Sequence, residues 1–91
     1  MATISINRKH KKSMADARTA VDRVAKAIAA KFQVSHQWEG NILHFSRPGV
    51  DGHIALGKGT VSVEAQLGFL LMVIKSSVET EIERYLDKEF G

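Results

Sequence analysis

The sequence predicts an α+β fold in which two helices cover one face of a curved antiparallel sheet, in the order strand, helix, four strands, helix. Residues 3–7 and 34–65 alternate between apolar and polar side chains, as half-buried strands do. Residues 13–32 and 67–90 instead carry apolar side chains three or four positions apart, as amphipathic helices do. Because the sheet would have one apolar and one polar face, it needs cover on one side only, and we expect the two helices to provide it.

Length and composition favour one small domain spanning residues 1–91. The chain has 91 residues, one proline and no cysteine, which excludes a disulfide framework. Its first residues lack the basic and then apolar pattern of a signal peptide, and no apolar run approaches the roughly 20 residues of a membrane-spanning helix. We therefore expect a cytoplasmic protein without a transmembrane segment.

The first strand and the first helix follow from local patterns. Ile4 and Ile6 share one side of the strand, which predicts that they face the core. Ser13, followed three residues later by Asp16, has the form of a capping box and predicts the start of the first helix. Core positions on this helix include Val24 and Ile28.

Glycine-containing turns divide the middle of the chain into a four-stranded meander. Gly40 and Asn41 predict a two-residue hairpin turn, which places Trp38 opposite Leu43 and His36 opposite Phe45, all on the core side. Pro48 and Gly49 stand where a type II turn places them, and residues 57–59 form a third turn. The element order is that of TATA-binding-protein-like and small helix-grip folds. By analogy, such folds host nucleic-acid binders, lipid carriers and oligomerisation modules alike.

The last segment is expected to be one long helix that begins at Leu67 and Gly68. Its first residues are apolar on nearly every side, so some of them fill the core and others can form a surface that binds a partner. Leu70, Met72 and Val73 are the candidates for that surface. The predicted core anchors of the whole chain are Ile4, Ile6, Val24, Ile28, Trp38, Leu43, Phe45, Ile54, Val63, Leu71, Ile74, Val78 and Ile82.

The polar face of the predicted sheet carries the only candidate metal ligands, His44, His53 and Glu64. If the turn at Pro48 were tight, His44 would lie opposite His53, and two imidazoles with a carboxylate could hold zinc with an open position for chemistry. A proline–glycine turn does not favour a tight hairpin, so the register stays open at this point. The simpler interpretation is a hydrated polar face without a metal or another cofactor.

Other motifs do not indicate catalysis. The chain has no cysteine nucleophile and no Gly-x-Ser-x-Gly elbow. The glycines at residues 57–59 lead into a strand and are too closely spaced for a phosphate-binding loop. We therefore expect no catalytic residues.

Charge is distributed unevenly along the chain, whose formal net charge is +3. Arg8, Lys9, Lys11 and Lys12 give residues 1–12 a charge of +4, whereas five acidic and two basic residues give residues 79–91 a charge of −3. This polarity could guide an anionic partner or align two copies of the chain. The basic run has no aromatic residue between its charges to stack on bases, so we do not expect nucleic-acid binding.

Five stretches of this sequence, taken together, are similar to the small bacterial polyhydroxyalkanoic acid system protein family. They are residues 4–10 (ISINRKH), 38–45 (WEGNILHF), 49–52 (GVDG), 64–71 (EAQLGFLL) and 82–88 (IERYLDK). The resemblance implies a role in storage of polyhydroxyalkanoate, a polyester kept in cytoplasmic granules. It implies no active-site motif, so no functional residue is carried over.

The sequence-based hypothesis is a non-enzymatic accessory or granule-associated protein of polyhydroxyalkanoate storage that acts by binding. We expect a homodimer, formed through the open sheet face or the long helix, with a polyester granule surface or granule proteins as possible further partners. A binding module for a small apolar ligand such as an acyl chain, in a pocket lined by Trp38, Phe45 and Phe69, is the first alternative. A metal-dependent enzyme on the histidine face is the second.

Overall fold

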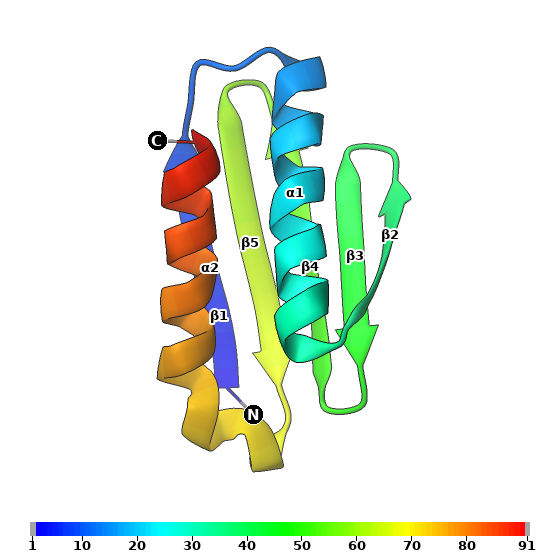
Figure 1. Ribbon diagram of the computed structural model, residues 1–91, viewed down its shortest axis with the longest axis vertical. Helices are drawn as coiled ribbons and strands as arrows, with labels where there is room; N and C mark the ends of the chain where they lie inside the picture. Colours follow the sequence, from blue (N-terminus) through cyan, green and yellow to red (C-terminus); the bar gives the residue numbers. More distant parts are fainter. Residues whose placement is uncertain (1, 91) are drawn as a thin grey trace.

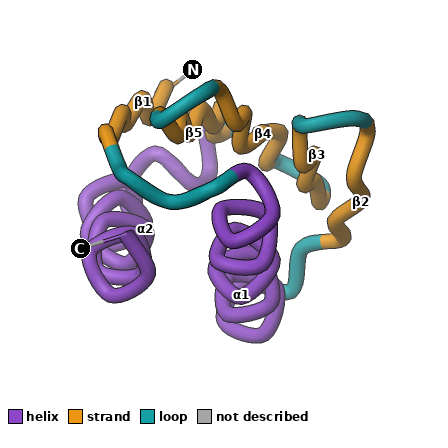
Figure 2. Tube along the Cα trace, turned by 90° about the horizontal axis from the view of Figure 1, so that it is seen from above, coloured by secondary structure: helices purple, strands orange, loops and turns teal. Residues whose placement is uncertain are grey.

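The computed structural model describes residues 2–90, with only the backbone described for Ala2 and for residues 69–71. It has two layers, a five-stranded antiparallel sheet and a pair of helices on one of its faces (Figures 1 and 2). The elements are β1 (Ala2–Lys9), α1 (Met14–Phe32), β2 (Ser35–Glu39), β3 (Ile42–Arg47), β4 (Val50–Gly57), β5 (Thr60–Leu67), the 3₁₀ helix η1 (Phe69–Ile74) and α2 (Lys75–Phe90). The predicted α+β class and the order β-α-β-β-β-β-α are confirmed.

The strands lie in the order β1-β5-β4-β3-β2, and every neighbouring pair is antiparallel. The meander β2 to β5 follows the chain, and β1 joins it at the edge beside β5. Figure 2 shows that the sheet bends, so that β2 and β3 lie beside α1 rather than flat above it. Because of this bend, β2 lies at the edge of the region of the sheet that the two helices cover.

Two tight turns set the register of the meander. Gly40 has a φ of 61°, which side chains with a Cβ rarely adopt, and the turn pairs Trp38 with Leu43 as predicted. Gly49 has a φ of 87°, close to the value of about 80° that a type II turn requires at its third residue. This second turn is a tight one, and it therefore answers the question of register left open by the sequence.

Helix α1 begins where the sequence indicates. Ser13 is the N-cap, and its Oγ accepts a hydrogen bond from the backbone N–H of Asp16 at 3.2 Å. The helix ends at Phe32, and Gln33 is its C-cap, with a left-handed conformation (φ 57°) and an N–H that donates to the carbonyl of Ala29. The buried face of α1 is small and aliphatic, which brings the helix close to the sheet, and consists of Ala17, Ala20, Val21, Val24, Ala25 and Ile28.

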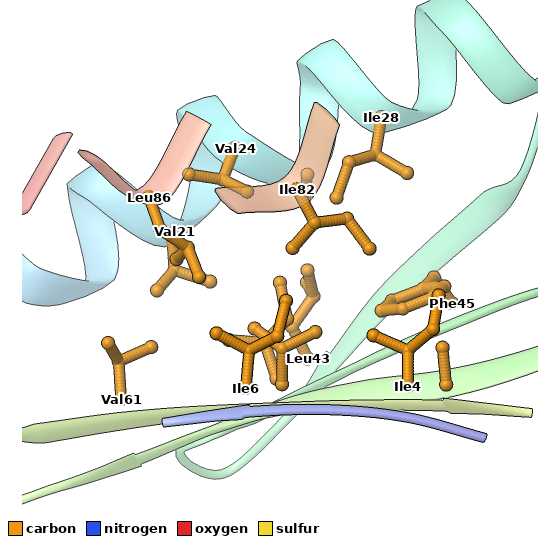
Figure 3. Close-up of a cluster of buried hydrophobic side chains, with 14 of the residues drawn as sticks. Ile4, Ile6, Val21, Val24, Ile28, Leu43, Phe45, Val61, Ile82 and Leu86 are labelled. Atoms are coloured by element: carbon orange, nitrogen blue, oxygen red, sulfur yellow. The ribbon is translucent and has the colours of Figure 1, made fainter. Parts of the chain in front are cut away.

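The core lies between the sheet and both helices. Figure 3 shows side chains from the inner face of the sheet, such as Ile6 and Leu43, interleaved with those of α1 and α2, such as Val24 and Ile82. The predicted anchors that are buried are Ile4, Ile6, Val24, Ile28, Leu43, Phe45, Ile54, Val63, Val78 and Ile82.

The expectation of one helix beginning at Leu67 is wrong. Strand β5 continues through Leu67, a 3₁₀ helix follows, and the α-helix begins at Lys75. A 3₁₀ helix has three residues per turn rather than 3.6, so its side chains point in other directions than an α-helix would give them. The assignment of Ile74 to the core is wrong for this reason, since its side chain is 38% exposed. The side chains of Leu70 and Leu71 lie outside the described residues.

Two further core assignments fail at strand β2. His36 pairs with Phe45 as predicted but is exposed, and Trp38 is only partly buried against the margin of the core. Strand β2 is an edge strand beside α1, so its inward-facing positions extend past the helices that would cover them. The alternation of side chains along β2 was predicted correctly, but the extent to which the helices bury this strand was overestimated.

Candidate functional site

One end of the molecule carries exposed aliphatic side chains. Met72, Val73 and Ile74, called the apolar tip below, are 41%, 88% and 38% exposed. They lie on η1, which projects beyond the sheet at the lower end of the view in Figure 1, near the start of β1. The molecule is elongated, 38 Å by 22 Å by 20 Å. The apolar tip therefore occupies one end of its long axis.

A small apolar hollow opens beside the apolar tip. It has a volume of about 50 Å³. Among the described residues that line it, only Arg47 is charged, and its Nη1 donates to the carbonyl oxygen of Phe32 at 2.8 Å. The lining residues come from α1, β3, β4, β5, η1 and α2, and are Ile28, Phe32, Phe45, Arg47, Val50, Ala65, Leu67, Ile74, Val78 and Ile82. Small-molecule sites usually have about 300–1,000 Å³, so this hollow admits at most the end of an aliphatic chain.

The hollow differs from the pocket expected from the sequence. Phe45 lines it as predicted, but Trp38 does not and instead lies under the guanidinium of Arg18, 4.1 Å from the ring centre. The side chain of Phe69 lies outside the described residues. Sequence reasoning missed Arg47 and Phe32, because no local pattern shows that the end of α1 meets the turn between β3 and β4.

A row of polar side chains crosses the outer face of the sheet, one from each strand. The register places Ser5 opposite Glu64, Glu64 opposite His53, and His53 opposite His44. Gln37 on β2 completes this row, called the histidine row below. The tight second turn thus brings the three candidate metal ligands of the sequence analysis onto neighbouring strands.

The two histidines of this row each stand near a carboxylate. His53 Nε2 lies 3.9 Å from Glu64 Oε2, and His44 Nε2 lies 3.8 Å from Glu39 Oε1. The two imidazole ring centres are 6.2 Å apart. As the side chains stand, no three His, Cys, Asp or Glu residues in the described part of the chain are grouped closely enough to hold a metal ion.

A polar hollow of about 370 Å³ lies over this part of the sheet. It is partly open to solvent and most of its lining residues are polar or charged, which suits a hydrated surface or a polar ligand better than an apolar one. The residues that line it are Thr3, His44, Phe45, Ser46, Asp51, Gly52, His53, Glu64, Ala65 and Gln66.

The basic and acidic segments of the chain meet in the folded protein. Strand β1 ends beside the end of α2 in Figure 1, and Arg8 Nη2 lies 3.4 Å from Asp87 Oδ1. Arg8 follows Ile4 and Ile6 on the inner side of β1, which directs it toward α2. Lys9, Lys11 and Lys12 remain exposed. The two charged segments therefore do not form separate poles, and part of the charge of each is neutralised by the other.

Ion pairs also join the two helices. Arg23 Nε lies 2.8 Å from Glu89 Oε1, and Lys31 Nζ lies 3.2 Å from Glu81 Oε1. The hydrogen bond from Lys31 lowers the pKa of Glu81 below its ordinary value, against the opposing effect of desolvation. At Asp22 desolvation would raise the pKa, but hydrogen bonds from Lys26 and Trp38 outweigh it and the pKa is lowered.

Among the described residues, no helix has both the length and the apolar character needed to span a membrane. Comparison with known proteins gave no match among curated proteins and none among solved structures. A comparison with protein families matched residues 4–90 to the family described as “putative polyhydroxyalkanoic acid system protein”. Because this match covers nearly the whole chain, the protein belongs to the polyhydroxyalkanoic acid system protein family.

Proposed function

We propose that the protein is a non-enzymatic accessory protein of polyhydroxyalkanoate storage that associates with the polyester granule in the cytoplasm through its apolar tip. The family supports the connection to polyhydroxyalkanoate. The observation that carries the mode of association is the exposure of Val73, 88%, between two further exposed aliphatic residues. Exposed apolar groups of this kind usually mark a binding surface.

Adsorption to an aliphatic polyester needs apolar area but no close fit of shape. Covering one large aliphatic side chain contributes about 1.5–3 kcal/mol, so the few residues of the apolar tip give weak, reversible adsorption. The loop between β1 and α1 lies at the other end of the long axis in Figure 1, and the exposed Lys11 and Lys12 that it carries would then face the solvent. Such charge keeps adsorbed particles dispersed.

Co-sedimentation with isolated polyester granules tests this proposal. Met72→Glu and Val73→Glu place a charge in the apolar tip, and each should weaken granule binding at least about tenfold. Ile42→Glu is the matched control, because Ile42 is 37% exposed and begins β3, whose start lies at the opposite end of the molecule from η1 in Figure 1. All three variants must first show the circular dichroism spectrum of the wild type. Equal binding by the wild type and both tip variants would contradict the proposal.

A homodimer belongs to the same proposal, formed either through the outer face of the sheet or through α2. Light scattering coupled to size exclusion measures the mass directly. A mass of twice 10.0 kDa is expected. A monomer at high protein concentration would exclude this part of the proposal.

The apolar hollow supports a second candidate function, in which the end of an acyl chain enters between Phe45 and α2. Its nearly uniform apolar lining favours this candidate, and its volume of about 50 Å³ restricts the ligand to a chain end. Val50→Trp, a substitution of a partly buried lining residue, would fill the hollow. Fatty-acid binding that is lost in this variant while granule binding persists would favour the second candidate over the first.

A further inference from the structure

The histidine row brings two imidazoles and a carboxylate together on three neighbouring strands. We propose that His44 and His53 bind a divalent transition metal ion of the zinc, nickel or copper kind, with Glu64 as a third ligand. This inference is independent of the proposed granule association. It rests on the register of β3, β4 and β5, which places each of these residues directly opposite the next.

The separation of the two rings is close to that of two imidazoles on a shared ion. A metal ion binds an imidazole nitrogen at about 2.0–2.1 Å, so two imidazoles at the tetrahedral angle of a zinc site have ring centres about 5.2 Å apart, and about 6.5 Å apart only when they lie on opposite sides of the ion. The observed distance between the ring centres of His44 and His53 is 6.2 Å. Directly opposed residues on antiparallel strands keep their Cβ atoms about 4.5–5.5 Å apart, so rotation of the side chains can bring the two rings about 1 Å closer, to the separation of a tetrahedral site.

The carboxylate of Glu64 lies within reach of the same ion. Two ligand atoms at about 2.0–2.2 Å from one ion are about 3.4 Å apart at the tetrahedral angle, and about 4.3 Å apart when they lie on opposite sides of the ion. His53 Nε2 and Glu64 Oε2 are 3.9 Å apart. His44 currently directs its Nε2 toward Glu39, at 3.8 Å, so binding requires the His44 ring to turn toward His53. His44 is exposed, and exposed side chains change rotamer freely on the nanosecond timescale.

The donor set selects the class of metal. Imidazole nitrogens suit zinc, copper and nickel, whereas magnesium and calcium prefer sites made of oxygen ligands alone. The polar hollow of about 370 Å³ beside these residues leaves room for water on the remaining coordination positions. Once the His44 ring has turned, the arrangement becomes that of a site with three protein ligands and open positions.

Equilibrium dialysis of the full-length, untagged chain against ⁠Zn²⁺ tests the inference, with Mg²⁺ as the metal control. The wild type should bind one zinc ion, and His44→Ala and His53→Ala should each lower the affinity at least about tenfold. Glu64→Gln should lower it less. His36→Ala is the matched control, because His36 is exposed on the same sheet but lies outside the histidine row. The zinc affinity of this variant should equal that of the wild type.

Zinc affinity that is the same in the wild type and in the double variant His44→Ala, His53→Ala would overturn the inference, as would an equal loss in His36→Ala. A second measurement uses only the wild type and so does not depend on the folding of variants. On addition of Ni²⁺, amide NMR signals around His44 and His53 should broaden first. Broadening centred on His10 or His36 instead would also overturn the inference.

Discussion

The ring of Phe45 on β3 lies over Gly52 on β4, the residue directly opposite it across the two strands. A Cβ atom at position 52 would stand 2.5 Å from Cζ of Phe45 and 2.7 Å from the carbonyl oxygen of Glu64. Real Cβ atoms essentially never come so close to other atoms, so a side chain at position 52 would force both the Phe45 ring and the neighbouring backbone to shift. Phe45, 4% exposed, thereby fills the inner side of the sheet and forms one wall of the apolar hollow.

Gly52→Ala should therefore destabilise the protein by about 1–3 kcal/mol, as overpacking of a core does. The reason is that one contact is with backbone, which cannot rotate away. Urea unfolding at pH 7 measures the change. Gly40→Asn is the control, because Gly40 has open space around it and asparagine tolerates its positive φ. A Gly52→Ala variant as stable as the wild type would show that the ring does not lie on the glycine.

Phe45→Ala and Trp38→Ala should differ in their effects on stability. The loss of the buried Phe45 side chain should cost about 3–5 kcal/mol. Trp38 is only partly buried and contributes mainly its stacking with Arg18 and a 3.4 Å hydrogen bond to Asp22, so its loss should cost about 1–2 kcal/mol. If both variants lost the same unfolding free energy in urea, Trp38 would belong to the core after all.

Ser13→Ala should cost about 1 kcal/mol, because the N–H of Asp16 loses its acceptor at the start of α1. Ser13→Asp keeps a side-chain acceptor and adds a charge that the helix N-terminus favours, so it should restore the wild-type stability. Thermal unfolding followed by circular dichroism measures both. If Ser13→Ala and Ser13→Asp unfold at the same temperature, the hydrogen bond of the cap does not contribute to stability.

Glu81 should make the stability of the protein depend on pH in the acid range. Its pKa is lower in the folded protein than in the unfolded chain, so its contribution is present above the ordinary glutamate pKa of about 4.3 and is lost as the pH falls through the lower folded value. In Glu81→Gln the difference in unfolding free energy between pH 7 and pH 3 should be smaller than in the wild type. The control is Glu83→Gln on the same helix. If this difference between pH 7 and pH 3 became equally smaller in both variants, the pairing of Glu81 with Lys31 would not be the cause of the pH dependence.

The parts of the fold that the sequence predicted depend on local chemistry. The cap at Ser13, the turn at Gly40 and the alternation of the strands each involve residues close together in the chain, so neighbouring residues determine them. The pairing of Trp38 with Leu43 then follows from the turn alone. The same reasoning placed His44, His53 and Glu64 on one face, and only the geometry of the second turn was left undecided.

The errors have a different origin. A run that is apolar on every side, as around Leu67 and Ile74, has no period from which a strand, a 3₁₀ helix and an α-helix can be distinguished. The exposure of His36 and Trp38 depends on how far the helices extend over the edge strand, which is a property of the whole fold. The apolar hollow likewise arises where the ends of six elements meet.

The most direct test of the granule hypothesis places a reporter at the apolar tip. The chain has no cysteine, so Val73→Cys offers a single thiol for a polarity-sensitive fluorophore, and Ile42→Cys offers the matched position at the other end of the sheet. On addition of polyester granules, the label at position 73 should shift its emission to the blue, and the label at position 42 should not. Equal shifts at both positions, or no shift at position 73 in granule-bound protein, would contradict adsorption through the apolar tip.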